Sequence, residues 1–189
     1  MHFTLADLAA DIAQNAAESG ADTVEMEIRE TASPDGRVEF RFTVKDNGKG
    51  MSRDEMERAK DPFVTDGVKH PRRKVGLGIP FLIQTASQSG GGWELHSAKN
   101  EGTAVTAWFD MNNVDTPPVG DLPGMFRTIL LFPGPEDILI RRAREGGGQD
   151  IQYELRKSEL AEAVGGLENA GSLALLSQYL RSMEEDDEE

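Results

Sequence analysis

A stretch near the N-terminus carries polar side chains at a spacing that suits a binding site. Apolar residues recur at helical spacing between Thr4 and Gly20, which predicts a helix. Within it, Asp11, Asn15 and Glu18 fall at positions i, i+4 and i+7, so their side chains project from one face. Two interpretations stay open: a solvated polar face, or polar groups held over a ligand.

A second stretch places an acid and two glycines between a strand and a helix. Apolar residues alternate from Val38 to Val44, then DNGKGM follows at residues 46–51, and Ser52 with Glu55 forms a predicted capping box. A two-residue hairpin turn would need only Asn-Gly. Glycines at such a place let the backbone approach a ligand closely.

A third stretch, residues 60–80, has no sustained period and ends in glycines. Gly76 and Gly78 precede a helix predicted for residues 79–89, and helix N-termini favour anions. A basic cluster at residues 72–74 lies just before them. The chain has no P-loop pattern and no dinucleotide fingerprint after a strand, which excludes those two kinds of nucleotide site.

These stretches alternate with further predicted elements. Residues 24–28 and 38–44 predict a hairpin joined by a turn at residues 33–36, and residues 93–98 and 103–110 predict another. Residues 112–124 are interpreted as a linker. Beyond it we expect a small α/β extension, residues 125–183. Its strand-like runs are residues 128–132, 137–144 and 150–156. A short helix capped by Ser158 and a last helix near residues 172–183 are expected to follow.

The composition limits the classes of function. The chain of 189 residues has a formal charge of −14, which argues against a nucleic-acid partner. Six acidic residues form the run 184–189, for which a solvated, disordered tail is expected. The absence of cysteine excludes disulfides and thiolate chemistry, and the three histidines lack ligand spacing. No apolar run suits a membrane span and no signal peptide is recognised, so a cytoplasmic protein is expected.

The order of these motifs resembles a known family. The chain resembles the ATP-binding domain shared by DNA gyrase B, Hsp90, histidine kinases and MutL, which is the GHKL superfamily. The resemblance rests on the first predicted helix, followed in order by DNGKGM, DPFVTD at residues 61–66, VGLGI at residues 75–79 and a Gly-Thr pair at residues 102–103. The resemblance covers residues 5–110. It implies an α/β (α+β) two-layer sandwich of the Bergerat type, with helices on one face of a mixed, mostly antiparallel sheet, in a domain of residues 1–111.

The resemblance also implies roles at the adenine. Asp46 takes the position of the acid that accepts a hydrogen bond from the adenine amine, and an ionised carboxylate suits this because it only accepts. Gly48 and Gly50 let the chain turn and pass the base without a Cβ. Met51 is expected to pack on the purine. Thr103 is expected to join Asp46 near the base.

At the phosphates, the resemblance implies ATP with Mg²⁺ as cofactors. Asn15 matches the residue whose side-chain oxygen coordinates Mg²⁺. Gly76, Leu77 and Gly78 match the phosphate-side glycines, whose N–H groups face oxygens. Residues 61–75 match the ATP lid, from which the side chains of Arg73 or Lys74 are expected to reach the phosphates.

Asp11 decides the kind of chemistry. In gyrase B and MutL a Glu stands four residues before the Asn and activates water, whereas histidine kinases usually have Asn there. Asp11 is one methylene shorter than Glu. A general base and a residue that only holds water or the metal shell both stay open.

The kind of family member follows from the regions around these motifs. Only three residues precede Thr4, so no phosphoacceptor helix is expected and autophosphorylation is disfavoured. The chain is similar to stand-alone histidine-kinase-like ATPases, which implies slow ATP hydrolysis coupled to a protein partner that the sequence does not identify. The alternatives are a serine/threonine kinase of the anti-sigma-factor type and a non-hydrolysing nucleotide sensor.

Overall fold

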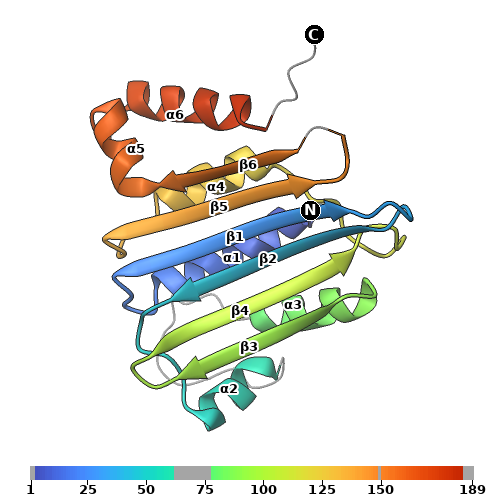
Figure 1. Ribbon diagram of the computed structural model, residues 1–189. Coiled ribbons are helices and arrows are strands. Elements are labelled where there is room, and N and C mark those ends of the chain that lie inside the picture. Colours follow the sequence, from blue (N-terminus) through green and yellow to red (C-terminus); the bar gives the residue numbers. More distant parts are fainter. Residues whose placement is uncertain (1–2, 62–77, 149, 185–189) are drawn as a thin grey trace.

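One six-stranded sheet runs through the described part of the computed structural model, residues 3–61, 78–148 and 150–184 (Figure 1). Its order is β3-β4-β2-β1-β5-β6; β1 and β5 are parallel, and every other neighbouring pair is antiparallel. The strands are β1 (Thr23–Ala32), β2 (Val38–Asp46), β3 (Gly92–Ala98), β4 (Gly102–Asp110), β5 (Asp137–Glu145) and β6 (Ile151–Arg156).

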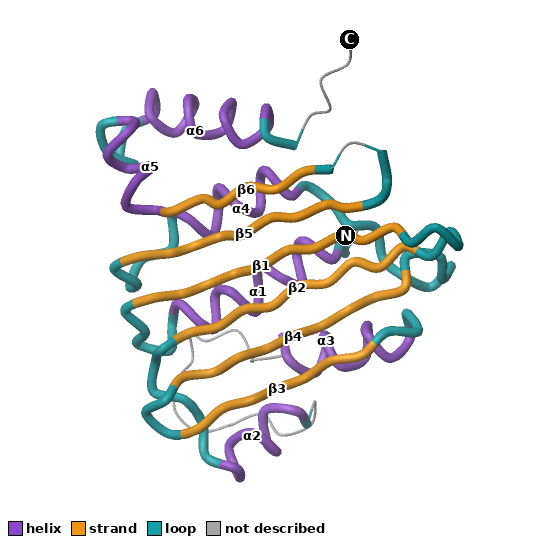
Figure 2. Tube along the Cα trace, viewed as in Figure 1, coloured by secondary structure: helices purple, strands orange, loops and turns teal. Residues whose placement is uncertain are grey.

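The described helices that pack on the sheet all lie on one of its faces. Figure 2 shows α1, α3 and α4 behind the strands in that view, with α5 and α6 beyond β6 and α2 beside β3. The helices are α1 (Leu5–Ala17), α2 (Arg53–Lys60), α3 (Gly78–Gln88), α4 (Leu122–Leu130), α5 (Lys157–Val164) and α6 (Ala170–Ser182). None of these described helices is both long and apolar enough to cross a bilayer.

The core lies between the helices and the covered face, as the strand periodicity predicts. Phe42 of β2 is paired with Ile28 of β1, and both are fully buried. Leu8 and Ile12 lie on the buried stripe of α1. Because strand side chains alternate between faces, one face is apolar and the other is polar. The predicted α+β two-layer fold is confirmed.

Local signals set the helix starts. Ser52 and Glu55 form the predicted capping box at α2, and Thr4 and Asp7 form one at α1. In each, the cap hydroxyl accepts from the N3 backbone while the N3 carboxylate accepts from the cap N–H. Both boxes satisfy N–H groups that have no partner inside the helix.

Residues 128–132 are not a strand, so this prediction is wrong. Asp121 accepts a hydrogen bond from Gly124 and caps α4, and Phe126, Ile129 and Leu130 are buried at helical spacing. A short apolar run fits a buried helix and a buried strand equally well. The helix therefore begins inside the predicted linker, and β5 that follows extends the sheet of the first four strands by pairing with β1.

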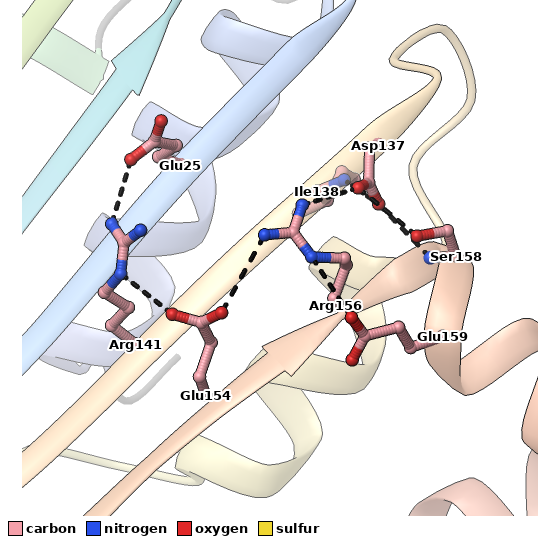
Figure 3. Close-up of polar contacts among 8 residues, drawn as sticks. All are labelled: Glu25, Asp137, Ile138, Arg141, Glu154, Arg156, Ser158 and Glu159. Carbon is pink, nitrogen blue, oxygen red and sulfur yellow. Dashed lines mark hydrogen bonds and ion pairs between the residues drawn. The ribbon is translucent and has the colours of Figure 1, made fainter.

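Ser158 does not cap α5, because it lies inside the helix. Asp137, at the start of β5, takes this role: its carboxylate accepts from Ser158 N at 3.2 Å and from Ser158 Oγ at 3.3 Å. Arg156 also donates to it at 2.9 Å, and Figure 3 shows Arg156 placed between Asp137 and Glu154. The cap comes from a distant strand, so local sequence gives no sign of it.

Arg142 is a buried cation on the covered face, with a side chain only 1% exposed. Its guanidinium donates to Glu184, at 2.9 Å, and to Glu30, and the Tyr153 hydroxyl also donates to Glu184. Burial, and then the hydrogen bond to the Glu184 carboxylate, raises the pKa of Tyr153. The expectation that the acidic run 184–189 is solvated is therefore wrong for Glu184. Residues 185–189 lie outside the described part of the chain.

Candidate functional site

Three polar side chains form a row across the covered face at one end of the sheet. In the strand register Asp46 of β2 lies opposite Thr103 of β4, and Thr103 lies opposite Ser97 of β3. The next row inward is apolar, with Val44 opposite Val105. Both valines are buried, so the polar row stands where the core ends.

Asp46 is held by one of its two carboxylate oxygens. Oδ1 accepts from Gly48 N at 2.8 Å, and Ser19 Oγ lies 3.0 Å from it. Ser19 Oγ also lies 2.7 Å from the carbonyl of Ala16, so its one proton serves either acceptor. Among the described residues none donates to Oδ2 of Asp46, which leaves this oxygen for a ligand donor.

Thr103 adds a second acceptor beside it. Ser97 Oγ accepts from Met51 N at 2.8 Å and lies 2.9 Å both from Gly102 O and from Thr103 Oγ1. If Ser97 gives its one proton to the Gly102 carbonyl, then Thr103 donates to Ser97. The lone pairs of Thr103 Oγ1 then remain for a ligand amine or a water.

The structure gives both glycines a packing reason within the chain itself. A Cβ on Gly48 would lie 2.0 Å from Ser19 Oγ. Gly50 has φ +58°, and a Cβ there would lie 1.8 Å from Ala98 O. The loop therefore packs against its own chain at both points, and the half-buried Met51 follows from this fixed path.

The helix α1 carries the second half of the site. Asp11 and Asn15 are exposed on one face, as predicted, and this face meets the start of α3. A Cβ on Gly78 would lie 3.3 Å from Asn15 Nδ2 and 3.7 Å from Asp11 Cβ. The predicted metal ligand, the predicted base and one phosphate-side glycine are thus neighbours at a helix N-terminus, where N–H groups favour anions.

The C-terminal end of α1 links the two halves. Asn15 lies in the last turn of α1, and Ser19 follows the C-cap residue Glu18. Ser19 contacts Asp46, and Asn15 lies beside Gly78. A ligand with a hydrogen-bond donor at one end and an anionic group at the other fits this arrangement.

Several predicted site residues lie outside the described part of the chain: Arg73, Lys74, Gly76 and Leu77. So does the predicted lid, residues 61–75, apart from Asp61, the C-cap residue of α2. The described residues contain no group of three or more His, Cys, Asp or Glu side chains that would hold a metal ion. Asn15 alone therefore suits Mg²⁺ only together with water and phosphate oxygens.

Sequence reasoning missed two serines. Ser97 falls at a core-facing position of β3, after Trp93 and Leu95, so a polar residue in a buried register was an available signal. Ser19 lies just after α1 and is joined to Asp46 only by the fold. No spacing in the sequence connects Ser19 with Asp46.

Two solved structures are similar to part of this chain. The mycobacterial sensor histidine kinase MprB matches at 21% identity over 56% of this chain and 70% of that chain, with a TM-score of 0.38. The histidine kinase domain of the E. coli osmosensor EnvZ matches at 21% identity over 45% of this chain and 51% of that chain, with a TM-score of 0.27.

A family model matches residues 3–113, from the start of α1 to just past β4. This range contains the polar row, the loop of Gly48 and Gly50, and the contact between α1 and α3. It confirms the resemblance drawn from the motifs. The chain belongs to the histidine kinase-, DNA gyrase B- and HSP90-like ATPase family.

Proposed function

We propose that the protein binds ATP with Mg²⁺, hydrolyses it slowly and couples this cycle to a protein partner. The observation that carries the proposal is the pair of acceptors at the end of the sheet. Asp46 Oδ1 accepts from Gly48 N, and Thr103 Oγ1 lies 2.9 Å from Ser97 Oγ, so Asp46 Oδ2 and Thr103 Oγ1 would be the acceptors for a ligand donor. The adenine amino group is a donor, whereas guanine presents a carbonyl at that ring position and would leave the acceptors unpaired.

The phosphates are assigned to the other half of the site. Gly78 begins α3, so its side of the site offers backbone N–H groups to anions. Asn15 would hold Mg²⁺ through its amide oxygen, with waters and phosphate oxygens as the other ligands. When bound, the metal neutralises phosphate charge and orients the triphosphate.

Hydrolysis is assigned to Asp11. It is exposed on the same face of α1 as Asn15 and lies next to Gly78. A carboxylate there accepts a proton from the attacking water. Asp reaches less far than Glu, which supports slow turnover.

Calorimetry with ATP and GTP, each with and without Mg²⁺, tests the binding proposal. We expect ATP to bind and GTP to bind at least about 10-fold more weakly, because the half-buried acceptors Asp46 and Thr103 would lose a donor. Equal affinity for both nucleotides would overturn the assignment of Asp46. Labelled ATP incubated with candidate partners then separates hydrolysis, phosphate transfer to protein, and sensing without chemistry.

A further inference from the structure

Three hydrogen-bond contacts surround the hydroxyl of Ser97, near the end of β3. Met51 N donates to its Oγ at 2.8 Å, while Gly102 O and Thr103 Oγ1 each lie 2.9 Å from it. A hydroxyl has one proton to donate and two lone pairs that accept. These three partners use all that the hydroxyl offers, so Ser97 itself has nothing left for a ligand.

The chemistry of these partners fixes where each proton lies. A backbone N–H only donates and a carbonyl oxygen only accepts. The Ser97 hydroxyl therefore donates to Gly102 O, since two oxygens at this distance need a proton between them. The contact between Ser97 and Thr103 also joins two oxygens at 2.9 Å, and Thr103 alone can supply its proton. Thr103 is thus the donor of this pair.

The hydrogen bond to Ser97 gives Thr103 a fixed polarity beside Asp46, which lies opposite it in the strand register. Because the single Thr103 proton is used, its Oγ1 keeps only lone pairs for a ligand. A threonine hydroxyl that is free to rotate would donate to a ligand carbonyl as readily as it accepts from a ligand amine. Ser97 therefore determines which of these two chemistries Thr103 presents.

We propose that Ser97 is a positioning residue that sets the base specificity of the site. By holding the Thr103 proton, it makes the site select a purine with an amino group over a purine with a ring carbonyl. The inference rests on the proposed binding of ATP. The carboxylate of Asp46 accepts in any case, and Thr103 adds a second acceptor only while Ser97 holds its proton. A site discriminates strongly when the wrong ligand leaves its polar groups unpaired.

Ser97 also supports the loop of Gly48 and Gly50 through Met51 N, and this purely structural role has a different consequence. A loosened loop would weaken the binding of every nucleotide by a similar factor. A freed Thr103 proton would instead change the ratio between the affinities for two bases. The ratio of affinities therefore distinguishes the positioning role from the structural one.

Calorimetry with ATP and with inosine triphosphate, both with Mg²⁺, tests the inference. In the inosine nucleotide a ring carbonyl and a ring N–H replace the amino group and the ring nitrogen of adenine. We expect the wild type to bind it at least about 10-fold more weakly than ATP. Ser97→Ala should lower this ratio about 3-fold or more, because the freed Thr103 hydroxyl then donates to the carbonyl. Ser97→Thr keeps the hydroxyl and should keep the ratio.

Further variants assign the effect to the Thr103 proton. In a Thr103→Val background, Ser97→Ala should leave the ratio unchanged, because no hydroxyl proton remains to be freed. Thr43→Ala is the matched control, because it removes a hydroxyl that lies 3.0 Å from Thr106 Oγ1 on the opposite face of the same sheet. Ser97→Cys, whose thiol is a weak acceptor, replaces Ser97→Ala if the melting temperature shows that the alanine variant is unfolded.

The outcomes separate this inference from the proposed function. If Ser97→Ala binds ATP and keeps the wild-type ratio, the positioning role is overturned while ATP binding stands. An equal change of the ratio with and without the Thr103 hydroxyl overturns it as well. A wild type that binds neither nucleotide would overturn the proposed function and this inference together.

Discussion

The hydroxyl of Ser19 lies 3.0 Å from Oδ1 of Asp46, across a separation of 27 residues. The same oxygen accepts from Gly48 N, so two contacts fix one oxygen and turn the other outward. A carboxylate held in this way loses little freedom when a ligand binds, which is the benefit of preorganisation. Ser19 is therefore expected to position Asp46.

Replacing Ser19 with Ala should weaken ATP binding by roughly 0.5–1.5 kcal/mol, the usual net value of one hydrogen bond. Calorimetry measures the loss. Ser87→Ala is a suitable control, because Ser87 is exposed and its hydroxyl donates to Ile83 O within α3. If Ser19→Ala and the control bind ATP equally well, the Ser19 contact has no positioning role.

Replacing Asp46 with Asn should weaken ATP binding by roughly 1.5–3 kcal/mol, the range for a hydrogen bond to a charged group. The amide oxygen must face Gly48 N, so the NH₂ group would stand where Oδ2 now lies. A donor would then meet the adenine amine. Undiminished affinity, with an unchanged melting temperature, would remove Asp46 from the adenine site.

Asn15→Ala tests the metal. We expect it to lose the Mg²⁺-dependent part of ATP affinity and keep the metal-free part, because only the amide oxygen is a ligand. Titrations with Mg²⁺ and with a chelator measure the two parts. An equal loss under both conditions would instead indicate a damaged α1.

The described elements between residues 3 and 111 could be predicted because their local sequence signals agree with the fold. Capping boxes at Thr4 and Ser52 and the alternation of Phe40, Phe42 and Val44 needed no distant partner. The extension was harder because its contacts are long-range. Asp137 caps α5 from another strand, and Arg142 is buried only because Glu30 and Glu184 come to it.

The same distinction holds within the site. Asp46, Thr103 and Asn15 carry motif signals, whereas Ser19 has none, since only the fold brings it to Asp46. The glycines were predicted for their freedom beside a ligand. In the structure, protein atoms also close the space that a Cβ would take, Ser19 Oγ at Gly48 and Ala98 O at Gly50.

Asp137 should make the extension sensitive to acid. Burial raises the pKa of Asp137, but hydrogen bonds from Arg156, Ser158 and Ile138 outweigh it, so the folded pKa is lowered. A carboxylate whose pKa is lower in the folded state stabilises the fold at pH values above its pKa in the unfolded chain, which is near 3.9. This stabilisation is lost as the pH falls through the pKa of the folded state.

Asp137→Asn should therefore cost about 1–2 kcal/mol at pH 7, from a lost cap and a partly exposed ion pair. Urea unfolding at pH 7 and at pH 3 measures the difference from wild type, which should shrink at pH 3. A difference that stays constant between the two pH values would mean that the carboxylate charge is not what stabilises α5. Asp150→Asn is a surface control.

Asp11 decides whether hydrolysis belongs to this chain. If Asp11 is the general base, Asp11→Asn should leave ATP affinity nearly unchanged and lower hydrolysis by about 10²–10⁴, the usual contribution of acid–base catalysis. The change keeps size and polarity at an exposed position beside Gly78, so folding should be little affected. Asp11→Glu is the sharper variant, because it restores the longer carboxylate of the gyrase B and MutL relatives. If the wild type is nearly inactive and Asp11→Glu hydrolyses ATP faster, the shorter natural Asp is what keeps hydrolysis slow, as expected of a sensor or slow switch. Full activity in Asp11→Asn would show that another group, or a partner, activates the water.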